Sequence, residues 1–180
     1  MQHQKIPIPI QTTMVSINKC STEGIPTIRQ LSEEIWKEVY PTIVSMEQID
    51  YMLEMMYSKK ALEEQITTLG HQFILVRYHD EIVGYASYSI KLKDEPKRYR
   101  LHKLYVKPEL HGKGLGKAMI SYISNEVSNA GGTELELNVN KKNPAVTFYQ
   151  HTGFVVESEM DLQIGQGFEM NDFIMVLKLQ

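Results

Sequence analysis

Apolar residues in the first third of the chain recur at the three- and four-residue spacing of a helix. Before them, a short stretch at 14–18 alternates apolar and polar residues, as a strand does. Four apolar residues then follow at spacings of three, four and four, which would place them on one face of a helix: Ile28, Leu31, Ile35 and Val39. Pro41 should end this helix, and the same periodicity returns over 46–57 and 59–69. The sequence therefore predicts a strand followed by three helices.

At residue 72 the period of the pattern changes to two. Stretches rich in β-branched and aromatic residues predict further strands at 72–78, 81–92, 98–106, 133–139, 154–160 and 173–179. Helical spacing returns at 114–130 and 144–151, and His79-Asp80 predicts a tight hairpin between the first two of these strands. This alternation predicts a single α/β domain over 1–180, with helices on both faces of a mixed sheet and an irregular segment at 1–13.

Length, composition and charge narrow the class of protein. The 180 residues are 42% hydrophobic and 23% charged, which is typical of one globular domain. The formal charge is −3 without any basic block, so nucleic acid is not an expected partner. No apolar run approaches the ~20 residues that cross a bilayer, so no membrane partner is expected. The single cysteine, Cys20, and the lack of an export signal predict a cytoplasmic protein, and the histidine spacing predicts no metal site.

The segment 104–117 carries the most chemical information. A strand end, a glycine-rich loop and a helix start follow one another directly, with Gly112, Gly114 and Gly116 in the loop. Glycines let backbone N–H groups approach a ligand closely, and a helix N-terminus adds partial positive charge, so the loop predicts an anion site. The spacing G-x-G-x-G differs from the dinucleotide pattern, and Ala118 after Lys117 excludes the Lys-Ser/Thr pair of a nucleotide P-loop.

Two ordered motifs resemble the GCN5-related N-acetyltransferase (GNAT) superfamily, over roughly residues 72–179. The first is L-x-V-x-P at 104–108, followed by His111-Gly-Lys-Gly-Leu-Gly116, where the family has [RQ]-x-x-G-x-[GA] and His111 replaces Arg or Gln. The second is L-x-V at 137–139, followed by Asn143, Ala145, Phe148, Tyr149, Gly153 and Phe154, with one residue fewer than usual between Asn143 and Ala145. The resemblance implies a mostly antiparallel sheet and acetyl-CoA as co-substrate, with no metal.

The resemblance also implies where acetyl-CoA would bind. Backbone amides from Gly112 to Lys117 would hold its pyrophosphate, and the main chain at 104–106 would pair with its pantetheine arm like an added strand. Asn143 would contact it directly or through water. The full set of expected cofactor-binding residues is Leu104, Tyr105, Val106, His111, Gly112, Lys113, Gly114, Leu115, Gly116, Lys117, Asn143 and Phe148.

The implied reaction is direct attack of an amine on the thioester within a ternary complex. A backbone N–H at Leu104 or Tyr105 would stabilise the oxyanion, and Tyr149 occupies the position of the family's proton donor. Tyr149 could instead serve only in packing, in which case water would protonate the departing thiolate. His102 is the candidate base, because alternation along its strand predicts that it shares a face with Leu104. It could instead be a hydrogen-bonded core histidine, with Glu33, Glu34, Glu38 or water as the base.

Acceptor recognition is expected from the first two helices and the turn between the last strands. The candidates are Trp36, Glu38, Tyr40, Tyr51 and Met55, together with the acidic segment 169–172, which the pattern predicts to precede the final strand. The acceptor is a small-molecule amine or a protein N-terminus, and the chain resembles the bacterial branch that includes polyamine N-acetyltransferases. A homodimer is a general expectation for such enzymes. The competing hypothesis is a non-catalytic acyl-CoA-binding module.

Overall fold

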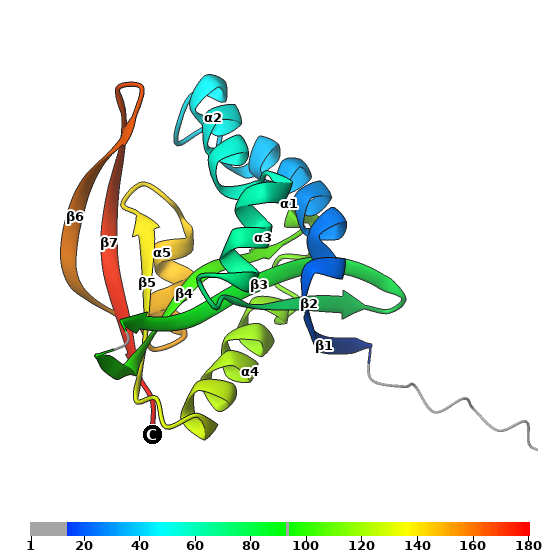
Figure 1. Cartoon of the computed structure of the whole chain (residues 1–180), viewed down its shortest axis with the longest axis vertical. Helices are drawn as coiled ribbons and strands as arrows, with labels where there is room; N and C mark the ends of the chain where they lie inside the picture. The colour runs from blue at the N-terminus through cyan, green and yellow to red at the C-terminus, as the bar shows by residue number, and fades with distance from the viewer. Residues whose placement is uncertain (1–13, 93) are drawn as a thin grey trace, which may run out of the picture.

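A computed structural model describes residues 14–92 and 94–180, so the expected irregular segment at 1–13 lies outside the described residues. Its sheet contains β1 (Val15–Cys20), β2 (Gln72–Tyr78), β3 (Glu81–Leu92), β4 (Glu95–Val106), β5 (Glu134–Asn140), β6 (Val155–Gly165) and β7 (Phe168–Lys178). The helices are α1 (Ile25–Val39), α2 (Met46–Tyr57), α3 (Lys59–Thr67), α4 (Leu115–Asn129) and α5 (Ala145–His151). Short 3-10 turns lie at Thr22–Gly24 and Pro108–Leu110 (Figure 1).

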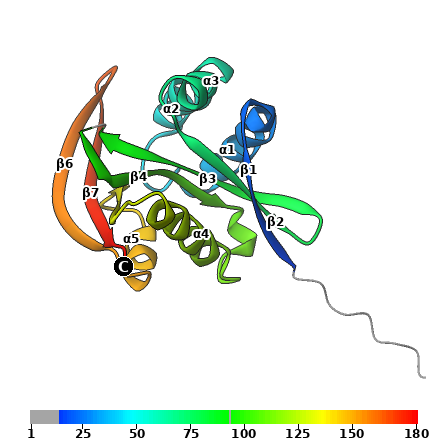
Figure 2. The same cartoon turned by 60° about the horizontal axis from the view of Figure 1, so that its bottom comes forward.

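The strands form one sheet in the order β1-β2-β3-β4-β5-β7-β6. Every neighbouring pair is antiparallel except β4 and β5, which are parallel and joined through α4. Helices α1, α2 and α3 cover one face, and α4 and α5 lie on the other (Figure 2). The prediction of a mixed, mostly antiparallel sheet with helices on both faces is therefore confirmed.

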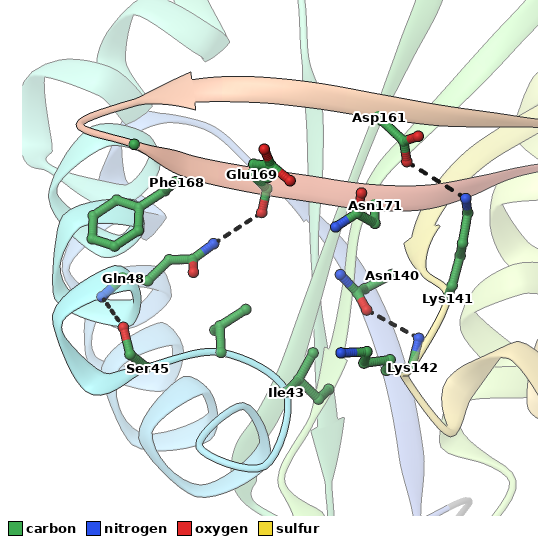
Figure 3. A pocket seen from close by; sticks show the side chains of 12 residues that line it. Ile43, Ser45, Gln48, Asn140, Lys141, Lys142, Asp161, Phe168, Glu169 and Asn171 are labelled. Carbon is green, nitrogen blue, oxygen red and sulfur yellow. Dashed lines mark hydrogen bonds and ion pairs between the residues drawn. The ribbon is translucent and has the colours of Figure 1, made fainter.

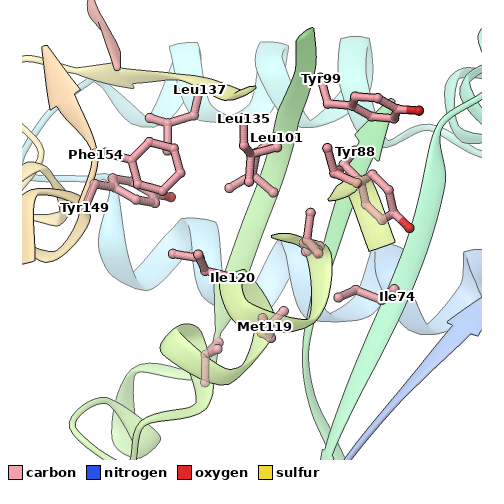
Figure 4. Close-up of a cluster of buried hydrophobic side chains, with 14 of the residues drawn as sticks. Ile74, Tyr88, Tyr99, Leu101, Met119, Ile120, Leu135, Leu137, Tyr149 and Phe154 are labelled. Carbon is pink, nitrogen blue, oxygen red and sulfur yellow. The ribbon is translucent and has the colours of Figure 1, made fainter. Parts of the chain in front are cut away.

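Each face of the sheet has its own apolar core. One face of α1 packs with α2 and the sheet, and Ile28, Leu31 and Ile35 are almost fully buried there, as their spacing predicts. On the other face, Met119 and Ile120 of α4 pack against the strands and α5 (Figure 4). Strands β2, β3 and β4 contribute side chains to both cores, so the middle of the sheet is packed on both faces.

The last two strands are longer than the sequence predicts. They form one hairpin through Gln166-Gly167, which both have positive φ, as two-residue hairpin turns require. The segment 169–172 therefore lies within β7 and does not precede it. The alternation does continue through 161–164 and 168–171, but the glycines at 165 and 167 interrupt it and none of these residues is fully buried, so the strand signal there is weak. No described helix has the length and apolar character needed to span a bilayer.

Candidate active site

The sheet opens between its two parallel strands. The β4–β5 pairing runs from Arg98 opposite Glu134 to Leu101 opposite Leu137 and stops there, although both strands continue. The main chain of 102–106 consequently has no sheet partner on its β5 side. An extended ligand could add to such an edge by hydrogen bonding to the backbone, as peptides do in strand addition.

A cavity of about 760 Å³ occupies this opening. It extends from the loop at 111–117, past the ends of β4 and β5, to α1 and the β6–β7 hairpin. The expected cofactor-binding residues line it, with the exception of Lys113, whose side chain is exposed and whose N–H donates to the Leu110 carbonyl at 3.3 Å. The structure thus brings two motifs that are distant in sequence to one cavity.

The glycine loop has the geometry of an anion cradle. Gly112 and Gly114 have φ of +80° and +79°, and a Cβ added at either would meet no atom within 4 Å, so both face open space beside the cavity. Gly114 is also the N-cap of α4, whose first backbone N–H groups lack helical partners. These features fit the pyrophosphate of acetyl-CoA. Gly116 differs, because a Cβ there would lie 3.0 Å from the Phe148 ring and would push α4 away from α5.

Asn143 and His111 each have a structural contact as well. The Asn143 side-chain oxygen accepts a hydrogen bond from the Ala145 N–H at 2.9 Å, which fixes the start of α5. His111 lies 3.1 Å from the Val106 carbonyl through its Nε2 and thereby links the loop to the end of β4. Both residues line the cavity, so these contacts set the shape of the site.

Tyr149 reaches the cavity from α5 and is 9% exposed. Its ring packs against Phe148 and Phe154, at centroid distances of 5.3 and 5.6 Å. Burial, together with the nearby Tyr40, raises the pKa of the Tyr149 hydroxyl above its ordinary value. The hydroxyl therefore stays protonated at neutral pH, which is the state that a proton donor requires.

The geometric argument for His102 is wrong, because β4 has a bulge there. Opposite β3, Ser87 pairs with Lys103 and Tyr88 pairs with Leu101, so His102 is an extra residue without a partner. Leu101 and Leu104 both pack in the core with α4 and α5, whereas the His102 ring stacks on His71 at 3.8 Å, on the α3 side. His102 and Leu104 thus face opposite sides of the sheet.

The surroundings of His102 do not favour the base role either. Its Nε2 lies 2.8 Å from the Ser89 hydroxyl, and burial, with smaller effects of His71, Lys103 and Arg100, lowers the pKa of His102 to about 2. An imidazole of such low pKa stays neutral but takes a proton from an ammonium poorly. The ring does border the cavity, so it can contribute to its shape.

The expected acceptor residues divide into two groups. Trp36 and Tyr40 line the cavity; their rings stack at 4.4 Å, and the Tyr40 hydroxyl is hydrogen-bonded to that of Tyr105 at 3.1 Å. Glu38 and Met55 are exposed, and with Tyr51 they lie outside the lining. Tyr51 instead donates a hydrogen bond to the Ile164 carbonyl at 2.9 Å, which attaches α2 to the β6–β7 hairpin. The exposed side of α1 also carries Glu33 and Glu34, away from the cavity.

A second cavity, of about 710 Å³, shares Asn140 with the first. Its walls come from the α1–α2 loop, the β5–α5 loop and the β6–β7 hairpin (Figure 3). Gln48 donates to the Glu169 carbonyl at 3.2 Å across it, and Lys141 contacts Asp161 at 3.5 Å. Acidic and basic side chains are mixed along these walls, so this cavity has no strong preference for one sign of charge.

Two buried charged residues line the first cavity, Asp172 and Lys103. Asp172 ends the segment 169–172 that the sequence suggests for acceptor recognition, although its burial is not predicted, and Lys103 is missed altogether. Asp172 is 1% exposed and Lys103 7%. The Lys103 ammonium is held by the Gln65 side chain at 2.8 Å and lies over the Tyr57 ring, and burial lowers its pKa to about 8. The burial of Asp172 was nevertheless indicated by alternation, since Met170, two residues before it, lies on the buried face of β7. For Lys103, alternation gives the wrong face because of the bulge in β4.

Comparison with known proteins identifies the family. A family model described as an acetyltransferase (GNAT) domain matches residues 41–176, most of the chain. The chain belongs to the GNAT acetyltransferase family. The match confirms the resemblance to this family that the glycine loop and the motif from Asn143 to Phe154 indicated. The chain is therefore an acetyl-CoA-dependent N-acetyltransferase.

Individual relatives of this GNAT chain differ in acceptor. A spermidine N(1)-acetyltransferase from Thermoplasma acidophilum is 29% identical over 171 residues, covering 92% of this chain and 98% of that protein. An L-amino acid N-acyltransferase from Escherichia coli is 29% identical over 107 residues, covering 58% of this chain and 62% of that protein. The crystal structure of PaiA N-acetyltransferase from Thermoplasma acidophilum in complex with coenzyme A has a TM-score of 0.75 at 27% identity, covering 92% and 99% of the two chains.

Proposed function

We propose that this enzyme transfers the acetyl group directly to a small primary amine within a ternary complex, with Tyr149 as the general acid. The observation that carries the proposal is the continuous cavity, which joins the glycine loop, the open edge of β4 and the Tyr149 side chain. Acetyl-CoA bound there supplies an activated thioester, so the chain need only position it, position the amine and move protons.

Each part of the cavity has a distinct task in this proposal. The backbone at Gly112, Gly114 and the first turn of α4 would hold the pyrophosphate, and the unpaired main chain at 102–106 would align the pantetheine arm. A backbone N–H at Leu104 or Tyr105 would donate to the developing oxyanion. Tyr149 would protonate the departing sulfur.

The acceptor would enter from the side of α1, α2 and the β6–β7 hairpin. Trp36 and Tyr40 there offer aromatic faces, which suit a cationic amine. Spermidine is the first acceptor to test, since a relative that covers almost the whole chain is a spermidine N(1)-acetyltransferase. An amino-acid amine is the second, in view of the L-amino acid N-acyltransferase. We further propose a cytoplasmic location and a homodimer, which fractionation and light scattering would test.

The test of the acid role is Tyr149→Phe, which retains the ring packing and removes the proton donor. We expect kcat to fall by roughly 10²–10⁴, while acetyl-CoA affinity measured by calorimetry changes little. A variant with wild-type kcat at every pH would refute the acid role. A wild-type protein that binds acetyl-CoA but acetylates no amine would instead favour the non-catalytic binding module.

A further inference from the structure

Asp172 is a buried carboxylate without a counter-ion at the centre of the site. It lies on β7 between Asn140 of β5 and Met160 of β6, and it lines the same cavity as Tyr149. The residue is 1% exposed, and its Oδ1 is buried without a hydrogen-bond partner. Within 14–92 and 94–180, no basic side chain forms an ion pair with it.

Lys141, the cation that acts on Asp172, is paired with other carboxylates. Lys141 contacts Glu159 at 2.7 Å and Asp161 at 3.5 Å, both on β6, so its charge acts on Asp172 only from a distance. Burying a carboxylate that lacks a partner is unfavourable for folding, and such groups are found mainly where a ligand completes their interactions. The open side of Asp172 is the cavity, which points to a cationic ligand there.

We propose that Asp172 binds the ammonium group of the acceptor and takes its proton before the attack on the thioester. This inference rests on the proposed function, for which it names the base and the acceptor-binding group. The ligand class is a primary amine that is protonated at neutral pH, and its N–H groups would satisfy the unpartnered Oδ1.

The proton balance of the step is complete. An ammonium N–H bond breaks and its proton forms an O–H bond with Asp172. The neutral amine nitrogen then forms a bond to the acetyl carbon while the carbon–sulfur bond breaks. The thiolate takes a proton from Tyr149, the second amine proton restores the Tyr149 hydroxyl, and Asp172 returns its proton to solvent. The products are the N-acetylamine and the free thiol of CoA.

The two proton-transfer groups, Asp172 and Tyr149, lie on opposite faces of the sheet. Met170 packs in the core with α1 and α2, so Asp172, two residues on, points to that side, whereas Tyr149 belongs to the core with α4 and α5. Tyr40 lines the same cavity and packs with the α1–α2 core. An amine held at Asp172 would thus meet the thioester from the side opposite the acid.

The ionisation of Asp172 suits this role. Burial raises its pKa to about 6, and Lys141 opposes the rise. Tyr40 of α1 and Lys141 of the β5–α5 loop act on it electrostatically. Glu159 and Asp161 of β6, which pair with Lys141, lie opposite Phe173 and Asn171 and so face the other side of the sheet. Above pH 6 the carboxylate is charged, so it can bind an ammonium and accept its proton.

The test compares Asp172→Asn with Asp80→Asn, a matched control that makes the same exchange at an exposed residue of the β2–β3 turn, outside both cavities. The probes are spermidine, L-leucine, kanamycin and an alanyl peptide, and kcat/KM for the best of them is measured against pH. We expect Asp172→Asn to lose roughly 10²–10⁴-fold in kcat/KM and to lose the acidic limb near pH 6, so that activity rises continuously with the fraction of neutral amine. The control should keep the wild-type profile, and acetyl-CoA affinity should be the same in all three proteins.

The outcomes separate the two proposals. Wild-type kcat/KM and an intact acidic limb in Asp172→Asn would overturn the inference while leaving the proposed function standing. A loss of acetyl-CoA affinity equal to the loss of activity would overturn it as well, because it would indicate a structural role. A wild-type protein that binds acetyl-CoA but acetylates none of the four amines would refute the proposed function itself.

Discussion

Replacement of Asp172 by Asn should stabilise the protein in a pH-dependent way. The amide has almost the same shape as the carboxylate, so the packing of β7 between β5 and β6 is retained. What changes is the ionisation, since burial raises the pKa of Asp172 from 3.8 to about 6. A folded-state pKa above the unfolded value means that the folded protein binds a proton more tightly. The wild type is then destabilised progressively as pH rises from about 4 to about 6.

The magnitude follows from the pKa difference. About two pKa units at about 1.4 kcal/mol each destabilise the wild type by about 3 kcal/mol at pH 7. The buried Asn amide has its own unfavourable desolvation, but that contribution does not depend on pH. We therefore compare the free-energy difference between variant and wild type at two pH values, which isolates the ionisation. Between pH 4.5 and pH 7 this difference should shift by about 2 kcal/mol in favour of the variant.

Urea unfolding followed by tryptophan fluorescence is the appropriate assay. The chain has one tryptophan, Trp36, which is 2% exposed in the core beneath α1 and reports directly on unfolding. Asp80→Asn serves again as the control, because its carboxylate is exposed in the β2–β3 turn and lines neither cavity. If the stability difference between Asp172→Asn and wild type were the same at both pH values, Asp172 would not be a buried unpaired carboxylate, and the reasoning would be refuted.

Four further substitutions test other parts of the structure. Gly112→Ala forces a Cβ into a backbone with φ of +80°, so the variant should bind CoA more weakly in calorimetry and lose about 1–2 kcal/mol of stability. Gly116→Val should weaken CoA binding too, and it should lower Tm because its side chain presses on the Phe148 ring. His102→Gln should lower Tm but leave the acidic limb of the kcat/KM profile in place; loss of that limb would restore His102 as the base. Glu136→Gln removes a fully buried carboxylate that binds three basic side chains, so thermal melting should show a loss of about 3–5 kcal/mol, and an unchanged Tm would contradict this.

The fold was largely predictable because its pattern is local. Ile28, Leu31 and Ile35 repeat with the helical period and are buried, and the β2–β3 strands alternate and pair as expected. The cofactor loop was predictable for a similar reason, since the strand end, the glycines and the helix start are contiguous in sequence. Hydrophobic periodicity in a single segment is sufficient to locate such features.

The bulge in β4 was not predictable from alternation alone. A parity count assumes that every residue of a strand advances the side chain to the other face, and one extra residue reverses every assignment beyond it. A signal was nevertheless present, because Leu101 and Leu104 are three residues apart and share one core. Apolar residues at an odd spacing within a strand indicate a bulge between them. The parity argument for His102 failed for this reason.

The importance of Asp172 could not be predicted because it depends on strands that meet only in the folded chain. Asn140 and Met160 lie on either side of it in the sheet, and both are distant in sequence. Alternation from Met170 indicates its burial, but its place beside the cavity depends on β7 lying between β5 and β6, although β6 follows β5 along the chain. The role of a polar residue in this strand depends on these neighbours.

The bulge and the opening of the sheet are adjacent and act together. Pairing of β4 with β5 ends at Leu101, and the extra residue of the bulge is His102. Within two residues β4 therefore loses its partner β5, and its side chains switch faces of the sheet. Past this point β4 presents unpaired main chain to the cavity, while Leu104 faces the side of Tyr149 and Lys103 faces the side of α3. An acyl transfer to an amine needs one group that takes a proton and one that gives a proton. If both lay on one face of a closed sheet, they would compete for the same space. The open sheet lets them approach the reacting atoms from opposite faces, with Asp172 on one side and Tyr149 on the other.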